Sequence, residues 1–99
     1  MPSIRVSVPH QLSRDEALRR VQRYIAQAKG ESEKVRELQE SWSGYEGKFS
    51  ASAMGYSASG SVAIGPSEVT VETALPLIAS PFKGKIETAI RDALARLLA

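Results

Sequence analysis

Hydrophobic and polar residues alternate in several short segments of the chain, a pattern typical of strands with one buried face. The first segment runs from Ser3 to Val8, and Pro9 ends it because proline has no amide hydrogen to donate to a neighbouring strand. The most regular segment runs from Glu68 to Leu75, after a Gly-Pro-Ser turn. Two further strands are expected between them, one beginning near Phe49 and one ending at Ile64.

Two other segments carry apolar residues at helical spacing. The first helix is expected from about Arg14 to Lys29. Its N-terminus has a capping box, in which the Ser13 hydroxyl accepts from the Glu16 amide and Glu16 reaches back to the Ser13 amide. Gly30 is a natural C-cap. The second helix is expected to open at Ser80-Pro81, with the serine as N-cap. The apolar positions are Leu18, Val21, Ile25 and Ala28 in the first helix and Ile86, Ala89, Ile90, Ala93, Leu94 and Leu97 in the second.

The charged stretch 31–38 fits two structures. Val35 and Leu38 have helical spacing, whereas the alternation from Leu38 to Trp42 suits an edge strand. A strand from about Arg36 to Trp42 is the preferred interpretation.

The expected order is therefore strand, helix, four strands, helix. Consecutive strands joined by short turns form an antiparallel meander. The 99 residues suffice for a single domain with one core. An α+β fold, with an antiparallel sheet of about five strands and both helices on one face, buries every apolar stripe at once. This is a reduced helix-grip-like arrangement, in which the last helix lies across a curved sheet.

Composition excludes several kinds of chemistry. The absence of cysteine excludes disulfides, a thiolate zinc site and a cysteine nucleophile. A single histidine leaves no histidine-based metal cluster, and we expect neither a metal nor a cofactor. No apolar run approaches the roughly 18 residues that a membrane span requires, and the N-terminus lacks the layout of a secretory signal. A soluble, cytoplasmic protein is expected.

Charge is distributed unevenly along the chain. The net charge of +2 divides into +4 over residues 1–30, −4 over 31–75 and +2 over 76–99. Arg19, Arg20 and Arg23 cluster on the polar face of the first helix, but Glu16 stands at ion-pair spacing from the first two. No aromatic platform interleaves with these arginines, as single-strand binders require. A solvated helix face is preferred, and no nucleic-acid partner is expected.

Catalytic signals are weak. His10, at the junction between the first strand and the first helix, is a candidate polar site, but no nucleophile stands beside it. The segment from Gly55 to Gly60 approaches the serine-hydrolase elbow, yet Ser59 stands where the second glycine belongs. That elbow also needs a strand-to-helix turn, whereas this segment lies between strands. No catalytic residues are assigned, and the chain is not expected to be an enzyme.

Two segments are candidates for binding. Small residues crowd the stretch 50–61, where they either leave space for a ligand or let a helix approach closely. The candidate pocket-lining residues are Ala51, Ala53, Ala58 and Gly60. At the C-terminal end, Leu94, Leu97 and Leu98 form a broad apolar stripe that we expect to be partly exposed and to contact a surface or a partner.

Several short motifs together resemble one known family, the small bacterial polyhydroxyalkanoic acid system proteins, which are encoded near polyester-granule genes. The similarity extends from Ile4 to Leu98. The motifs are Pro9-His10-Gln11-Leu12-Ser13, Trp42-Ser43-Gly44 followed by Phe49, Val69-Thr70-Val71-Glu72, and Leu75-Pro76-Leu77 leading to Lys83-Gly84-Lys85-Ile86-Glu87.

The resemblance implies an accessory role. Polyester synthases use a cysteine nucleophile and depolymerases a serine elbow, and this chain has neither. The first hypothesis is a non-enzymatic, granule-associated protein that binds the polyester granule surface or a granule protein. The alternative is a helix-grip module that binds an apolar small molecule such as an acyl chain. The ligand, the partner and the formation of a homodimer are left open.

Overall fold

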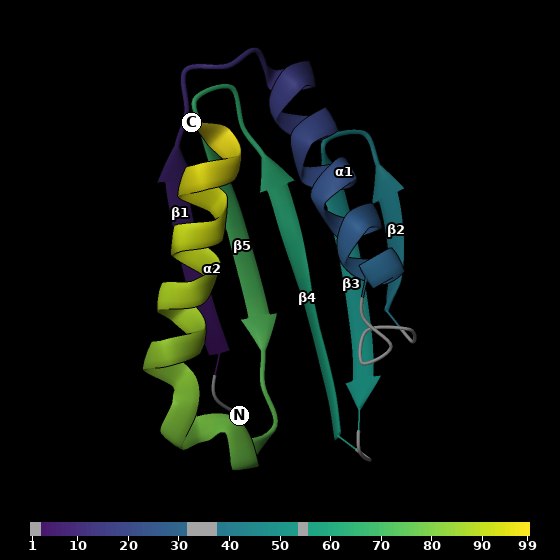
Figure 1. Ribbon diagram of the computed structural model, residues 1–99, viewed down its shortest axis with the longest axis vertical. Helices are drawn as coiled ribbons and strands as arrows, with labels where there is room; N and C mark the ends of the chain where they lie inside the picture. Colours follow the sequence, from purple (N-terminus) through teal and green to yellow (C-terminus); the bar gives the residue numbers. More distant parts are fainter. Residues whose placement is uncertain (1–2, 32–37, 54–55) are drawn as a thin grey trace.

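The computed structural model describes residues 3–31, 38–53 and 56–99. Five strands form one antiparallel sheet in the order β1-β5-β4-β3-β2 (Figure 1). The strands β2 to β5 follow one another as a meander, and β1 pairs with β5 at the other edge. Their bounds are Ser3–Pro9 (β1), Gln39–Ser43 (β2), Glu46–Ala53 (β3), Tyr56–Ile64 (β4) and Glu68–Ala74 (β5).

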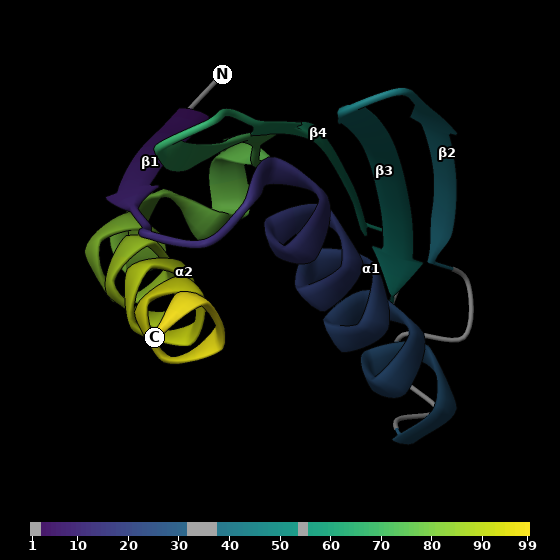
Figure 2. The ribbon, with the colours of Figure 1, turned by 90° about the horizontal axis from the view of Figure 1, so that it is seen from above.

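Two α-helices cover the same concave face of this curved sheet (Figure 2). They are α1 (Arg14–Glu31) and α2 (Lys83–Leu98), and a 3-10 helix, η2 (Leu77–Phe82), directly precedes α2. The α+β fold with both helices on one face is therefore confirmed. Among the described residues, no helix combines the length and hydropathy needed to cross a bilayer.

The core lies between the sheet and the helices. Alternate residues of β1, β4 and β5 point inward, as the two-residue period of a strand requires. Val6 pairs with Val71, which pairs in turn with Val62, so three neighbouring strands present valine at one level. The buried apolar residues are Ile4, Val6, Val8, Ala17, Val21, Val62, Ile64, Val69, Val71, Leu75, Leu94 and Leu98.

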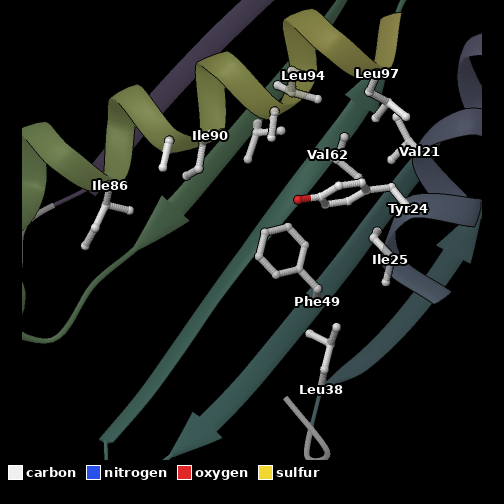
Figure 3. Close-up of a pocket in the computed structure, with 13 residues that line it drawn as sticks. Val21, Tyr24, Ile25, Leu38, Phe49, Val62, Ile86, Ile90, Leu94 and Leu97 are labelled. Atoms are coloured by element: carbon white, nitrogen blue, oxygen red, sulfur yellow. The ribbon is translucent and has the colours of Figure 1, made fainter. Parts of the chain in front are cut away.

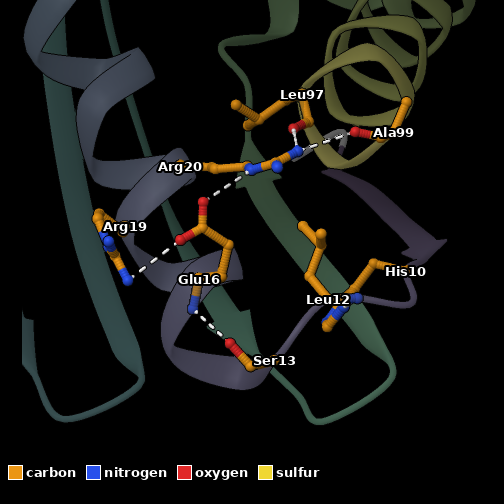
Figure 4. Close-up of polar contacts among 8 residues, drawn as sticks. All are labelled: His10, Leu12, Ser13, Glu16, Arg19, Arg20, Leu97 and Ala99. Carbon is orange, nitrogen blue, oxygen red and sulfur yellow. Dashed lines mark hydrogen bonds and ion pairs between the residues drawn. The ribbon is translucent and has the colours of Figure 1, made fainter.

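The N-terminus of α1 forms half of the expected capping box. The Glu16 amide donates to the Ser13 hydroxyl at 3.1 Å. The Glu16 carboxylate, however, turns to Arg19 and Arg20, each at 3.1 Å, rather than back to the Ser13 amide (Figure 4). The expected ion pairs on this face are therefore present, and they take the place of the second capping bond.

Two expected boundaries are wrong or untested. The helix α1 continues through Gly30 to Glu31, because a glycine permits but does not force a helix end. The strand β2 begins at Gln39, and the expected start at Arg36 lies outside the described residues. The turn before β3 is short and uses Gly44, whose φ of 59° suits glycine, while Gly47 belongs to β3.

The start of the second helix also differs from the prediction. Ser80 is not an N-cap, because it lies inside η2, where its carbonyl accepts from the Lys83 amide. The α-helix begins only at Lys83, after Phe82, and no side chain caps it. The 3-10 helix follows Pro76, whose fixed φ of −65° leads into a tight turn, and it contains Pro81.

Replacing Ser13 with alanine should lower the free energy of unfolding by about 1 kcal/mol, because the Glu16 amide loses its acceptor. Urea denaturation measures this as a lower midpoint. Ser41, which is exposed on β2, provides the matched control, since Ser41→Ala should leave the midpoint nearly unchanged. Equal midpoints for the two variants would show that the cap does not stabilise α1.

Candidate functional site

An apolar groove of about 450 Å³ lies between the two α-helices and the concave face of the sheet (Figure 3). Its floor is made by Phe49 of β3, Val62 of β4 and Val71 of β5. Leu38 lines it from just before β2. The walls are Val21, Tyr24 and Ile25 of α1 and Ile86, Ala89, Ile90, Ala93, Leu94 and Leu97 of α2.

The groove exists because the helices are joined at one end and diverge from there (Figure 1). Near the C-terminal end of α2, the Arg20 guanidinium donates to the main-chain oxygens of Leu97 at 3.2 Å and Ala99 at 2.8 Å. The same side chain is held by Glu16 (Figure 4). Away from this link, α1 lies over the β3–β4 side of the sheet and α2 over the β1–β5 side (Figure 2), and the residues of β3, β4 and β5 that face the space between the helices form the floor of the groove.

The lining is almost entirely hydrocarbon. Of the thirteen lining residues, Tyr24 alone carries a polar side-chain atom, and its ring extends into the groove (Figure 3). Tyr24 is 48% exposed, and its hydroxyl has no hydrogen-bond partner among the described residues. The lining residues that the structure describes offer no carboxylate, imidazole or amine. The groove is therefore suited to an apolar ligand, and the Tyr24 hydroxyl is available to bond a polar group on that ligand.

Ala51, Ala58 and Gly60 do not line this groove, and Gly60 lines a second hollow over β1, β4 and β5 instead. Ala51 pairs with Ala58 across the β3–β4 ladder, and both residues are half-buried outside the groove lining. Ala53 ends β3, and its side chain lies outside the described part of the structure.

Gly60 supports the groove indirectly. It pairs with Phe49 across the β3–β4 ladder, and a Cβ added at this position would lie 2.8 Å from Cζ of the Phe49 ring and would also collide with the Glu72 carbonyl oxygen. A side chain at this position would therefore displace the ring. Gly60 lets Phe49 lie flat as part of the groove floor.

The C-terminal leucines are less exposed than the sequence suggested. Leu94 and Leu98 are 7% and 5% exposed, and Leu97 is half-buried in the groove wall. Partial exposure of this stripe is therefore limited to Leu97, whereas Leu94 and Leu98 belong to the hydrophobic core. The large exposed apolar residues lie elsewhere, on α1 (Tyr24) and on η2 (Leu77, Ile78 and Phe82).

His10 is a structural residue. It is 7% exposed, its Nδ1 accepts from the Leu12 amide at 3.1 Å, and its Nε2 therefore donates to the Gly65 carbonyl at 3.0 Å. Its own amide also donates to the Ser67 carbonyl. Both ring nitrogens are occupied in tying the β1–α1 junction to the β4–β5 turn, and the ring lies outside the groove lining.

A second polar cluster, which the sequence did not reveal, fixes the start of α1. The Tyr45 hydroxyl donates to Asp15 at 2.5 Å, and the Arg14 guanidinium lies 3.9 Å from the ring centre while its Nε donates to the Ile64 carbonyl. The hydrogen bond to Asp15, reinforced by its charge, raises the pKa of Tyr45 above the ordinary 10.0. The phenol therefore stays protonated and keeps its role as donor at neutral pH.

The polar groups of the described structure do not form a competing site. Within that part of the chain, no group of three acidic or histidine side chains is arranged to hold a metal ion. The clusters around His10, Tyr45 and Arg20 each consist of side chains bonded to other parts of the fold. A second hollow, of about 420 Å³ over β1, β4 and β5, is lined mostly by polar residues, among them the ion pair of Arg5 and Glu72. The groove is thus the candidate site for an apolar ligand.

The family whose sequence profile matches this chain is described as "Putative polyhydroxyalkanoic acid system protein", and the match covers residues 4–98. The chain belongs to this family. No curated protein matches it significantly. Among solved structures, the crystal structure of TTHA0849 from Thermus thermophilus is similar, at 12% identity and a TM-score of 0.48, over 98% of this chain and 94% of that one.

Replacing His10 with alanine should lower the free energy of unfolding by about 2–3 kcal/mol, because two buried hydrogen bonds and a packed ring are lost. His10→Asn should cost less, since an asparagine side chain can still accept from the amide two residues ahead. Urea denaturation distinguishes the two. An alanine variant as stable as the wild type would contradict the structural role.

Proposed function

We propose that this member of the polyhydroxyalkanoic acid system family is a non-catalytic accessory protein that binds an aliphatic chain in the groove between α1 and α2. The proposal rests on one observation, a groove of about 450 Å³ whose lining has a single polar side-chain atom. That volume falls within the range of small-molecule sites in proteins. Of the two functions that the sequence left open, the groove favours the binding of an acyl chain.

The shape of the lining favours a chain over a compact ligand. Ile86 and Leu97 stand eleven residues apart on α2, which is about 16 Å along a helix axis. Burying eight methylene groups over such a length contributes about 6 kcal/mol, from which the cost of association is subtracted. Hydrocarbon contact alone can therefore hold a medium-length acyl chain.

The Tyr24 hydroxyl supports a ligand with one polar end or ester group. A phenol donates readily to a carbonyl oxygen, which a hydroxyalkanoic acid or its polyester provides. The family to which the chain belongs concerns polyesters of this chemistry. Where the acyl chain belongs to a polyester granule or to a protein on it, binding the chain associates this protein with the granule. Such binding requires no catalytic group.

Filling the groove should abolish this binding. Ala93→Phe places a phenyl ring in the groove wall, and we expect at least tenfold weaker binding of cis-parinaric acid, followed by its fluorescence, and of 3-hydroxydecanoic acid, followed by displacement. The melting temperature should not fall, because the added ring covers apolar surface that is otherwise open. A stable variant that has lost the ligand would separate binding from folding.

Ala95→Phe is the matched control, because Ala95 lies on the same helix, is exposed and does not line the groove. It should bind both probes as the wild type does. Unchanged binding by Ala93→Phe, or no binding by the wild-type protein, would refute the proposed function.

A further inference from the structure

Exposed apolar residues cluster in η2, directly before α2. Leu77, Ile78 and Phe82 of η2 are 71%, 58% and 56% exposed. Single exposed hydrophobic residues are common on protein surfaces, but three large ones within six residues of one turn form a patch. These three residues are called the η2 patch below.

The fold does not need the η2 patch. Ala79 is the residue of η2 that packs against the core, and no residue of η2 is fully buried. The Ala79 amide donates to the Pro76 carbonyl at 2.9 Å, and Pro81 stiffens the same turn. The patch is thus presented on a preformed support, so docking it onto a surface would cost little conformational entropy.

Positive charge follows the patch directly. Lys83 and Lys85 are exposed and make no ion pair among the described residues, and the first turn of α2 contains no acidic residue. The next acid on this helix, Glu87, is paired with Arg91 at 3.4 Å. Lysines at a helix N-terminus oppose the positive end of the helix dipole, so their position does not serve the stability of α2.

We propose that this end of the molecule docks onto a layer of anionic amphiphiles, such as a lipid layer with phosphate headgroups. Leu77, Ile78 and Phe82 enter the hydrocarbon zone, while Lys83 and Lys85 contact the headgroups. Apolar side chains beside unpaired cations are what such an interface binds. Of the six residues of η2, Ser80 alone has a hydrogen-bonding side chain, which suits a fluid hydrocarbon layer better than a polar protein partner.

Docking in this way has a consequence for the groove. Phe82 directly precedes α2, four residues before Ile86, which lines the groove, so the η2 patch and the groove meet near the start of this helix. The docked molecule therefore holds one end of the groove next to the hydrocarbon of the layer. This consequence alone rests on the proposed function, whereas the docking itself does not.

Co-sedimentation of the full chain with vesicles tests the proposal. We expect binding to vesicles of equal parts phosphatidylglycerol and phosphatidylcholine, and at least tenfold weaker binding to phosphatidylcholine alone. The double variant Ile78→Ser/Phe82→Ser should reduce binding to the anionic vesicles at least tenfold. Lys83→Gln/Lys85→Gln should also reduce it, by roughly ten- to thirtyfold, and should leave the weak binding to neutral vesicles unchanged.

Two controls make the test specific. Arg23→Gln/Lys48→Gln removes the same charge from exposed positions away from η2 and should bind as the wild type does. Ala93→Phe, which fills the groove, should also bind vesicles normally, so failure of the proposed function leaves this result unaffected. Melting curves verify that each variant is folded, as expected for substitutions at exposed positions.

The proposal is overturned if anionic and neutral vesicles bind equally, or if the η2 variants bind as the wild type does. It is also overturned if the control Arg23→Gln/Lys48→Gln loses as much binding as the variant of Lys83 and Lys85, because net charge alone would then explain the attraction. Absence of binding to any vesicle would reject a lipid layer and leave a protein as the partner of the η2 patch.

Discussion

The guanidinium of Arg20 joins α1 to the end of α2, and the architecture of the helical layer follows from that link. Held by Glu16 on its own helix, Arg20 donates to two main-chain oxygens at the end of the other (Figure 4). These oxygens lie in the last turn and just after it, where carbonyl groups lack partners within the helix. One side chain therefore satisfies the end of α2 and fixes the distance between the helices at that point.

A sheet of five strands offers more concave surface than two diverging helices can cover. The helix α2 lies over β1 and β5, and the middle of the sheet forms the floor of the groove (Figure 2). The residues that line it come from the same apolar stripes that make the core. The same apolar stripes thus form the core and line the groove. The small residues Ala89 and Ala93 on α2 keep the space between the helices open.

The groove and the η2 patch lie close to each other at the start of α2. Phe82 belongs to the patch and Ile86 to the groove, one helical turn further along. The molecule consequently has a closed end, where Arg20 joins the helices, and an apolar end, where they stand apart. A protein that takes up hydrocarbon chains from an amphiphile layer requires such an apolar end against the layer, because the chain has to leave the layer without crossing water.

Patterns between residues close in sequence were sufficient for most elements. The alternation in β1 and β5, the helical stripes and the Ser13 cap each arise from interactions within a few residues, so they are readable in the chain and present in the fold. Both helices could be placed on one face because each had a single apolar stripe to bury.

The predictions that were wrong depended on partners far away in sequence. Leu98 belongs to the hydrophobic core, and Arg20, 78 residues earlier, bonds the main chain on either side of it. The separation of two helices is set by such long-range contacts, which leave no periodic trace in the sequence.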